Sequence, residues 1–331
     1  MRDHTRARIS CGGLGVHYLI AVFGTFILVT AAIPLVKTLA LRIGLVDLPN
    51  ARKVHQKPMP FVGGIAMAFG VLVVAWILPV PPDFRAGITG GGLVILAVGL
   101  ADDFLKSRGR DLSAAPKFAG QVLAALLLLS AGIRVEFLSN PFSGGMIHLA
   151  NWQSLAVTVL WVVGVANIIN FMDGLDGLAC GIVTIAALTM AGVSLFMGDY
   201  GMFLMSLALA AVTTAFLRFN FNPASMFMGD GGAYFLGFVL AAVSIEGAFK
   251  SATVVGLAVP VLILGLPIAD TVYNVIRRVR NGQPFYIADR GHAHHRLLNA
   301  GFDQRQVVLV LYLISACFSL TALLVMFAGR F

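Results

Sequence analysis

Carboxylate and amide side chains in residues 167–181, NIINFMDGLDGLACG, have a spacing that could bind a metal ion. Asn170, Asp173 and Asp176 recur every third residue, so on a continuing helix they would share one face. Gly174 and Gly177 can interrupt such a helix and also let a ligand approach the backbone closely. Oxygen ligands of this kind suit Mg²⁺, which binds through one or two carboxylates together with substrate phosphates. Helix capping by the same residues is the competing interpretation.

Further acidic residues lie outside this segment. Asp102 and Asp103 are adjacent, so on a helix only one of them can face a given site, and a solvated helix end is the plain alternative. Asp230, in MGDGG, precedes an apolar helix whose free N–H groups could hold an anion beside a cation. An ordinary N-cap is the alternative there. Asp270 lies within an apolar run and should face protein, paired with Arg277 or with another polar neighbour.

The segment 289–298, DRGHAHHRLL, has the opposite charge. His292, His294 and His295 lie between Arg290 and Arg296. Flanking arginines would repel a transition metal, and no cysteine or acidic partner stands at a matching interval. Arginine instead offers paired donors, and imidazole a further hydrogen bond or a proton, to a diphosphate. A solvated basic loop is the alternative.

The elements that must position these residues are membrane helices. The chain is 59% hydrophobic and only 11% charged, and apolar runs of membrane-spanning length recur along it. We therefore expect an all-α polytopic membrane protein, a single domain over residues 1–331 with about ten transmembrane helices. The outer connection 133–153 could form a small periplasmic β-hairpin or a plain loop. The expected spans, of which the third is short, are 17–40, 63–80, 86–101, 115–132, 154–170, 178–197, 201–219, 231–247, 251–275 and 306–328.

Basic residues are distributed unequally between the two faces of this arrangement. The chain has 23 Lys and Arg against 15 Asp and Glu, a net charge of +8. If successive spans cross the membrane in opposite directions, one face carries most of the lysines and arginines. The loops of the other face carry Arg85, Arg134 and Lys250. The positive-inside rule makes the first face cytoplasmic and puts both termini outside, although the basic N-terminus argues against this. Such a distribution favours membrane orientation and contact with anionic lipid over nucleic-acid binding.

The polar segments all fall on the expected cytoplasmic face. They are residues 55–64, 101–111, 170–177, 220–232 and 289–298. Transporters instead tend to place ionisable residues near the membrane midplane. Metal ligands, a basic loop and a hydrophobic body together suit phosphoryl transfer to or from a membrane lipid. A transporter that uses Asp173, Asp230 and Asp270 as a cation or proton relay is the alternative.

With these motifs the chain resembles the polyprenyl-phosphate N-acetylhexosamine-1-phosphate transferases, relatives of phospho-N-acetylmuramoyl-pentapeptide transferase. The resemblance runs from HQKPMPFVGG through ADDF, NIINFMDGLDGLACG and MGDGGAYFLGF to DRGHAHHRLLNAGF, nearly the whole chain. It implies a bacterial inner-membrane enzyme, with its active site facing the cytoplasm, that transfers N-acetylhexosamine 1-phosphate from a UDP-sugar to undecaprenyl phosphate and releases UMP. The HAHHR loop favours GlcNAc, while GalNAc or an N-acetylated deoxysugar stays open, as does the glycan that is initiated.

The resemblance also implies roles, motif by motif. Asp102 and Asp103 match the acidic pair near the polyprenyl phosphate, and Asp102 is the candidate base or nucleophile. Asp230 matches the principal Mg²⁺ ligand, with Asn170 and Asp173 at the metal and diphosphate; Mn²⁺ is a candidate substitute. Asp176 matches a residue on the nucleoside side of the site. His292, His294 and His295 match the loop that binds the diphosphate, and Lys57, Arg290 and Arg296 are further substrate-binding positions. The catalytic candidates are Asp102, Asp103, Asp173 and His294.

Two further expectations concern mechanism and assembly. A phosphate monoester has a second pKa of about 6 and is mostly dianionic at pH 7. We therefore expect Asp102 to orient the acceptor, or to help hold the cation, in one direct attack rather than to remove a proton. A homodimer stays open, because an interface between lipid-facing helices would leave no signature in the sequence.

Overall fold

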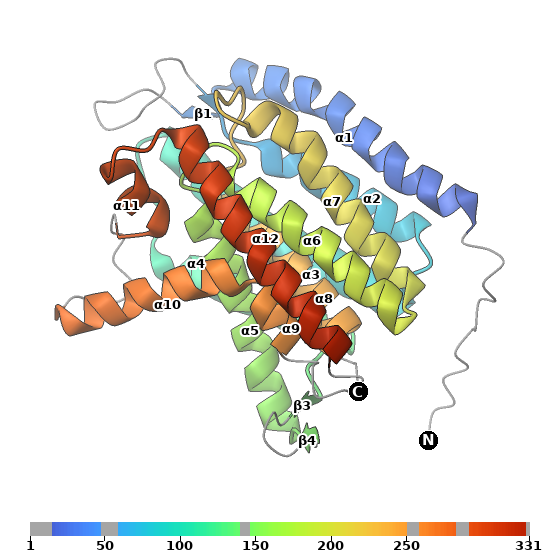
Figure 1. Ribbon diagram of the computed structural model, residues 1–331. Helices are drawn as coiled ribbons and strands as arrows, with labels where there is room; N and C mark the ends of the chain where they lie inside the picture. The colour runs from blue at the N-terminus through green and yellow to red at the C-terminus, as the bar shows by residue number, and fades with distance from the viewer. Residues whose placement is uncertain (1–14, 48–58, 140–145, 250–257, 283–290, 329–331) are drawn as a thin grey trace.

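The computed structural model describes residues 15–47, 59–139, 146–249, 258–282 and 291–328, and the described chain is a bundle of helices (Figure 1). The helices, with a single π-helical segment η1, are α1 (Val16–Ile43), α2 (Gly63–Ile77), α3 (Pro82–Ser107), α4 (Ala114–Ser130), α5 (Asn151–Met172), α6 (Leu178–Met197), α7 (Tyr200–Asn220), α8 (Gly229–Ser244), η1 (Ile245–Phe249), α9 (Ala258–Ile263), α10 (Gly265–Arg280), α11 (Ala293–Asn299) and α12 (Gln304–Ala328). Two-residue strands β1 (Val46–Asp47) and β2 (Met59–Pro60) pair with each other, as do β3 (Phe137–Ser139) and β4 (Met146–His148).

The long helices have the length and composition of membrane spans. Among the described residues, α1, α3, α5, α6, α7 and α12 are long and apolar enough to cross a membrane, and α2 and α4 are shorter apolar helices. Large apolar side chains such as Phe23 and Leu35 on α1 and Leu313 on α12 are exposed, as lipid-facing positions should be. The expected all-α polytopic membrane protein is confirmed, whereas the number of spans stays a prediction.

Helix α8 is the central element of the bundle. From Gly231 to Ser244 each of its residues is buried, which explains why its sequence is apolar around the whole helix rather than along one stripe. Helices α2, α3 and α5 pack against it. Backbones approach closely there, because a Cβ at Gly99 of α3 would overlap the backbone of Gly231, and a Cβ at Gly64 of α2 would overlap that of Gly232. The N-terminal end of α8 is therefore held between α2 and α3.

Two expected spans differ from the structure. The third, expected over 86–101 and short, is the 26-residue α3, which begins with Pro82 at its first turn and continues through a charged last turn. The ninth, expected over 251–275, is described from Ala258 onward and is divided at Leu264 into α9 and α10. The cause is local, since Gly265 and Pro267 fall at the start of α10 and break the preceding helix.

Helix α10 has a polar side facing the protein and an apolar side facing outward. Asp270, Asn274 and Arg278, spaced by one turn, are buried, and the exposed apolar residues are Val272, Tyr273, Val275, Ile276 and Val279. Figure 1 shows α10 running across α12 and away from the bundle. Polar groups directed inward and apolar groups outward are the arrangement expected of a helix in contact with lipid.

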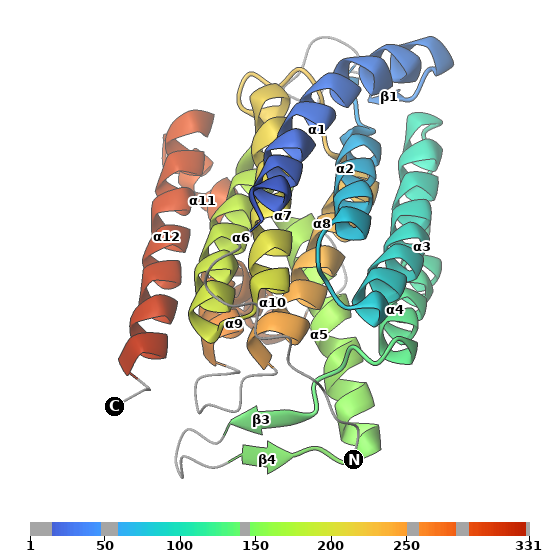
Figure 2. The same cartoon turned by 90° about the vertical axis from the view of Figure 1, so that its right-hand side faces the viewer.

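The β3–β4 hairpin lies at one end of the bundle. Phe137–Ser139 pair antiparallel with Met146–His148, which confirms the hairpin expected in the connection 133–153. Figure 2 places this hairpin and the C-terminal end of α12 at one end, and β1 at the opposite end. The polar segments that the sequence singled out gather at the β1 end, as the next section describes.

Candidate active site

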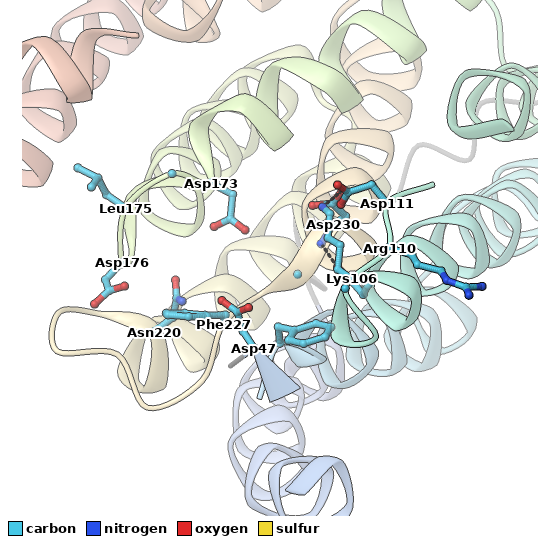
Figure 3. Close-up of a pocket in the computed structure, with 15 residues that line it drawn as sticks. Asp47, Lys106, Arg110, Asp111, Asp173, Leu175, Asp176, Asn220, Phe227 and Asp230 are labelled. Carbon is cyan, nitrogen blue, oxygen red and sulfur yellow. Dashed lines mark hydrogen bonds and ion pairs between the residues drawn. The ribbon is translucent and has the colours of Figure 1, made fainter. Parts of the chain in front are cut away.

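A cavity of about 600 Å³ opens at the β1 end of the bundle (Figure 3). Its walls come from β1, the end of α3, the α3–α4 loop, the α5–α6 turn and the start of α8. The lining residues are Asp47, Phe61, Asp103, Lys106, Gly109, Arg110, Asp111, Asp173, Gly174, Leu175, Asp176, Asn220, Phe227, Gly229 and Asp230. Four of the five polar segments named from the sequence thus contribute to one cavity, in agreement with the expected convergence.

Asp103 binds the backbone at the N-terminus of α8. Its Oδ1 accepts a hydrogen bond from the N–H of Asp230 at 2.9 Å, and its Oδ2 accepts one from Gly231 at 3.0 Å. These are two of the four N–H groups that a helix leaves without an internal partner. A carboxylate from α3 therefore caps α8, and it fixes the backbone that carries the Asp230 side chain.

Asp102 faces the other way, toward two lysines. Its Oδ2 lies 2.6 Å from Lys117 Nζ and 2.9 Å from Lys106 Nζ, and its Oδ1 accepts the Leu112 N–H at 2.9 Å. Both lysines also reach Asp230 Oδ2, at 2.8 Å from Lys106 and 3.6 Å from Lys117. Asp102 is fully buried and is not among the described residues that line the cavity. Its contacts with Lys106 and Lys117 connect it to Asp230, which lines the cavity.

The α5–α6 turn carries Asp173 and Asp176 into the cavity from the opposite side (Figure 3). Helix α5 ends at Met172, and Gly177 has a φ of 82°, a left-handed conformation that favours glycine. The helix therefore does not continue through this turn, in line with the interruption that Gly174 and Gly177 made possible, and Asn170, Asp173 and Asp176 do not share one helical face. Asp176 Oδ2 accepts hydrogen bonds from Asn222 Nδ2 at 3.1 Å and from the Ala224 N–H at 3.0 Å, which ties the α7–α8 loop to the turn.

The electrostatics at Asp173 fit a site for a cation. Burial, followed by the negative charges of Asp230, Asp103 and Asp176, raises the pKa of Asp173 well above its usual range. Neighbouring carboxylates that repel one another in this way are what a divalent cation would neutralise. Among the described residues no three His, Cys, Asp or Glu side chains are close enough to form a complete metal cage. Mg²⁺ does not require one, because substrate phosphates and water supply its remaining ligands.

Asn170, the third expected metal ligand, is one turn before this cavity. Its backbone carbonyl accepts the Asp173 N–H at 3.1 Å, so it helps to end α5. It is not among the described residues that line the cavity. Of the expected ligands, Asp173 and Asp230 line the cavity, and Lys106 contacts Asp230. These carboxylates fit Mg²⁺ or Mn²⁺, both of which accept oxygen ligands.

The histidine segment reaches the cavity at Gly174. A Cβ on Gly174 would come within 2.5 Å of His294 Nε2, so the ring of His294 lies directly against this glycine. Burial, with the nearby charges of His295 and His292, lowers the pKa of His294 to about 4. His294 is therefore neutral at pH 7. The rings of His292 and His294 are stacked, with centroids 5.7 Å apart, and the His295 ring lies 4.4 Å from that of His294.

Asp270 proves to be the partner of this segment. Its Oδ2 lies 2.6 Å from His292 Nδ1, and its Oδ1 accepts the Ala293 N–H at 2.7 Å. Arg296 is about half exposed, with its guanidinium over the Tyr273 ring at 4.4 Å. The expectation that Asp270 has a polar protein partner is confirmed. Two of the expected site residues, Lys57 and Arg290, lie outside the described residues.

Several lining residues were not singled out from the sequence. Lys106 lines the cavity, and Lys117 lies beside it in contact with Asp102 and Asp230. A lysine in the first turn of the otherwise apolar α4 was the available signal. Asp47, Asn220 and Phe227 offered none, because an isolated polar or aromatic residue beside a loop is common in any membrane protein.

Comparison with known proteins identifies the family of this chain. The model of glycosyl transferase family 4 matches residues 86–248. A probable undecaprenyl-phosphate N-acetylglucosaminyl 1-phosphate transferase of Bacillus subtilis is 39% identical over 309 residues, 93% of this chain and 85% of the relative. A decaprenyl-phosphate N-acetylglucosaminephosphotransferase of Mycobacterium tuberculosis is 35% identical, over 84% of this chain and 75% of the relative.

A more distant branch matches over a similar length. A phospho-N-acetylmuramoyl-pentapeptide-transferase of Desulforamulus reducens is 31% identical, over 94% of this chain and 93% of the relative. Matches of this identity and extent span the cavity, α8 and the histidine segment together. The chain therefore belongs to glycosyl transferase family 4, the family of polyprenyl-phosphate N-acetylhexosamine-1-phosphate transferases that its motifs resemble.

Proposed function

We propose that this protein transfers N-acetylglucosamine 1-phosphate from UDP-GlcNAc to undecaprenyl phosphate and releases UMP, as the first step of a cell-envelope glycan. The observation that carries the proposal is the cavity that Asp173, Asp230 and Lys106 line at one end of a membrane bundle. Support for the sugar and the lipid comes from the printed names of the Bacillus and Mycobacterium relatives.

In the proposed reaction an oxygen of undecaprenyl phosphate attacks the β-phosphorus of UDP-GlcNAc, and the bond from that phosphorus to the bridging oxygen breaks as UMP leaves. Asp173 and Asp230 would hold Mg²⁺, which when bound offsets the charge of the diphosphate. Lys106 places a further positive charge beside Asp230. The acceptor phosphate is already mostly dianionic at neutral pH, so the residues need to position it rather than deprotonate it.

The proposed location is the bacterial inner membrane, with the cavity toward the cytoplasm where the UDP-sugar is present. The unequal distribution of basic residues supports this orientation. The rival function, a transporter with an aspartate relay, has less support. Asp173 and Asp230 lie at one end of the bundle and Asp270 is bound to His292, so they do not form a path through the membrane.

The test is UMP release by detergent-purified protein given undecaprenyl phosphate and UDP-GlcNAc, with and without Mg²⁺. We expect release only with Mg²⁺, with Mn²⁺ as a substitute, and loss of release in Asp230→Ala. Asp199→Ala is the matched control, since Asp199 caps α7 at the end opposite Asn220, the residue of α7 that lines the cavity. Release with UDP-GalNAc but not UDP-GlcNAc would correct the sugar. Folded protein that is silent with every donor but moves ions in proteoliposomes would favour the transporter.

A further inference from the structure

Asp270 is a buried carboxylate on a helix that the proposed reaction does not use. It is 4% exposed, and an ionised group at membrane depth requires partners. The shortest contacts of its two oxygens are with the histidine segment, 22 and 23 residues further along the chain, and Asn274 Nδ2 donates to Oδ1 at 3.3 Å. Oδ2 meets His292 Nδ1 at 2.6 Å and Oδ1 meets the Ala293 N–H at 2.7 Å.

These contacts form one end of a continuous chain that reaches the cavity. Ala293 is the first residue of α11, and the next residue, His294, lies against Gly174 in the cavity wall. Asn274, one turn after Asp270 on the same buried side of α10, donates to the Asp270 carbonyl at 2.8 Å and also lies 3.2 Å from His292 Nδ1. The inward side of α10 therefore holds the start of α11 in place.

The hydrogen bond to Asp270 also decides which nitrogen of His292 is free. An ionised carboxylate only accepts, so Nδ1 must carry the hydrogen that it donates. Nε2 is then the nitrogen available to a ligand, and the partner of one imidazole nitrogen fixes the role of the other. The groups that face this pair are Arg296, 3.9 Å from Asp270 Oδ1, and His294, stacked on His292.

We infer that Asp270 is a positioning residue for the reaction, which fixes the tautomer of His292 and holds the histidine segment against the cavity. The inference rests on the proposed function, because it assigns His292 a part in that reaction. Asp270 does not touch the cavity that holds Asp173 and Asp230, so its effect passes through His292 and α11.

Asp270→Asn separates these two tasks. The amide oxygen still accepts the Ala293 N–H, but the amide nitrogen faces His292 and can only donate, which forces the hydrogen onto Nε2. In serine-protease triads the same substitution produces the wrong tautomer with little change of geometry. We expect kcat to fall roughly 10- to 100-fold, the usual cost of removing a partner that orients a functional histidine, with a melting temperature near that of the unaltered protein.

A double-mutant cycle with His292→Gln tests whether Asp270 acts through the histidine. The Asp270→Asn, His292→Gln double variant should be no less active than His292→Gln alone, since the pathway is already broken. Asp199→Asn, the same change at the N-cap of α7, should retain full activity. Additive losses in the cycle, or a fully active His292→Gln, would overturn the inference. If Asp270→Asn does not fold, Asp270→Glu enters the same cycle, because it displaces the carboxylate by one methylene.

The tautomer can be read independently of activity. With ¹⁵N-labelled histidine, the His292 ring signals, assigned by their absence in His292→Gln, should report Nδ1–H in the unaltered protein and Nε2–H in Asp270→Asn. An unchanged tautomer would overturn the inference even in an active enzyme. A tautomer change in a protein that releases no UMP from any donor would instead contradict the proposed reaction and leave the Asp270–His292 pair in place.

Discussion

Asp102 is buried beside the cavity, and each of its oxygens already has a partner within the protein. A base must reach the proton that it removes, in a direct hydrogen bond or through one water. Asp102 instead holds Lys117 and Lys106, which reach Asp230. The contacts of its neighbour Asp103 are with the backbone of α8. Both members of the acidic pair thus act on the position of Asp230.

Asp102→Asn should lower activity to the same extent at pH 7 and pH 9. The amide keeps the size of the side chain but removes the charge that holds the lysines. A hydrogen bond between charged groups contributes roughly 1.5–3 kcal/mol, so we expect kcat/KM to fall about 10- to 100-fold. UMP release at the two pH values is the measurement. Recovery of activity at pH 9 would show that Asp102 removes a proton after all.

His294 should make the protein less stable in mild acid. Its folded pKa is about 4 against an ordinary 6.5, so between these values the unfolded chain takes up the proton and the folded one does not. The stabilisation is therefore complete above pH 6.5 and is lost as the pH falls toward 4. Melting temperatures from pH 7.5 to 4.5 should fall less steeply in His294→Gln. His148→Gln, on the exposed hairpin, should keep the original slope.

Among the contacts between elements, the one between α3 and α8 positions the acidic residues of the site. Gly99 and Gly231 leave no room for a side chain between the two helices, and this close approach is what lets Asp103 reach the N-terminus of α8. Small residues at helix contacts are typical of membrane bundles. The position of Asp230 thus depends on the packing of the adjacent Gly231 against Gly99 as much as on its own hydrogen bonds.

Gly99→Ala should therefore lower both stability and activity. The new methyl would meet the backbone of Gly231, which cannot move as a side chain can, and overpacking of this kind costs about 1–3 kcal/mol. Gly90→Ala is the matched control on the same helix, because its Cβ would be 3.9 Å from Leu127, an ordinary contact. Melting temperature and UMP release should fall in the first variant only. Equal effects in both would mean that the tight contact is not what matters.

The sequence predicted the elements better than their junctions. Apolar runs located the helices because a membrane-spanning helix must be apolar over the thickness of the hydrocarbon core. The same runs hid the break at Leu264, where apolar residues continue through the change of direction, and only Gly265 and Pro267 marked it. The apolar runs also underestimated the length of α3, because its charged last turn is helical although it lies beyond the apolar stretch. The Asp270–His292 contact joins two elements that no local pattern relates.

For the whole molecule, the two ends of the bundle differ in chemistry. The cavity and most described basic residues lie at the end that includes β1, and the β3–β4 hairpin lies at the other (Figure 2). By the positive-inside rule, this distribution supports the proposed orientation, in which the cavity faces the cytoplasm. The assignment of loops to alternate faces of the membrane predicted that the polar segments lie on one side. Which side chains contact one another inside the cavity could be learned only from the three-dimensional structure.

Cysteine labelling in intact cells tests this orientation. In a variant whose Cys11, Cys180 and Cys317 are replaced by Ser, a cysteine at Ile147 in the hairpin should react with a membrane-impermeant maleimide added outside. A cysteine at Arg108, exposed at the end of α3, should react only after the cells are permeabilised. The reverse pattern would place the cavity outside and remove its access to a cytoplasmic nucleotide sugar.

The glycine contacts at the start of α8 also bear on how such a protein can diverge. Where Gly64, Gly99, Gly231 and Gly232 meet, backbone lies against backbone, so a mutation there changes the separation of helices rather than the shape of a side chain. The rim of the cavity, by contrast, is made of loops that connect those helices. Selection for another donor sugar would therefore alter the loops and leave the helical junction intact, so that one inherited reaction centre could serve many different glycans.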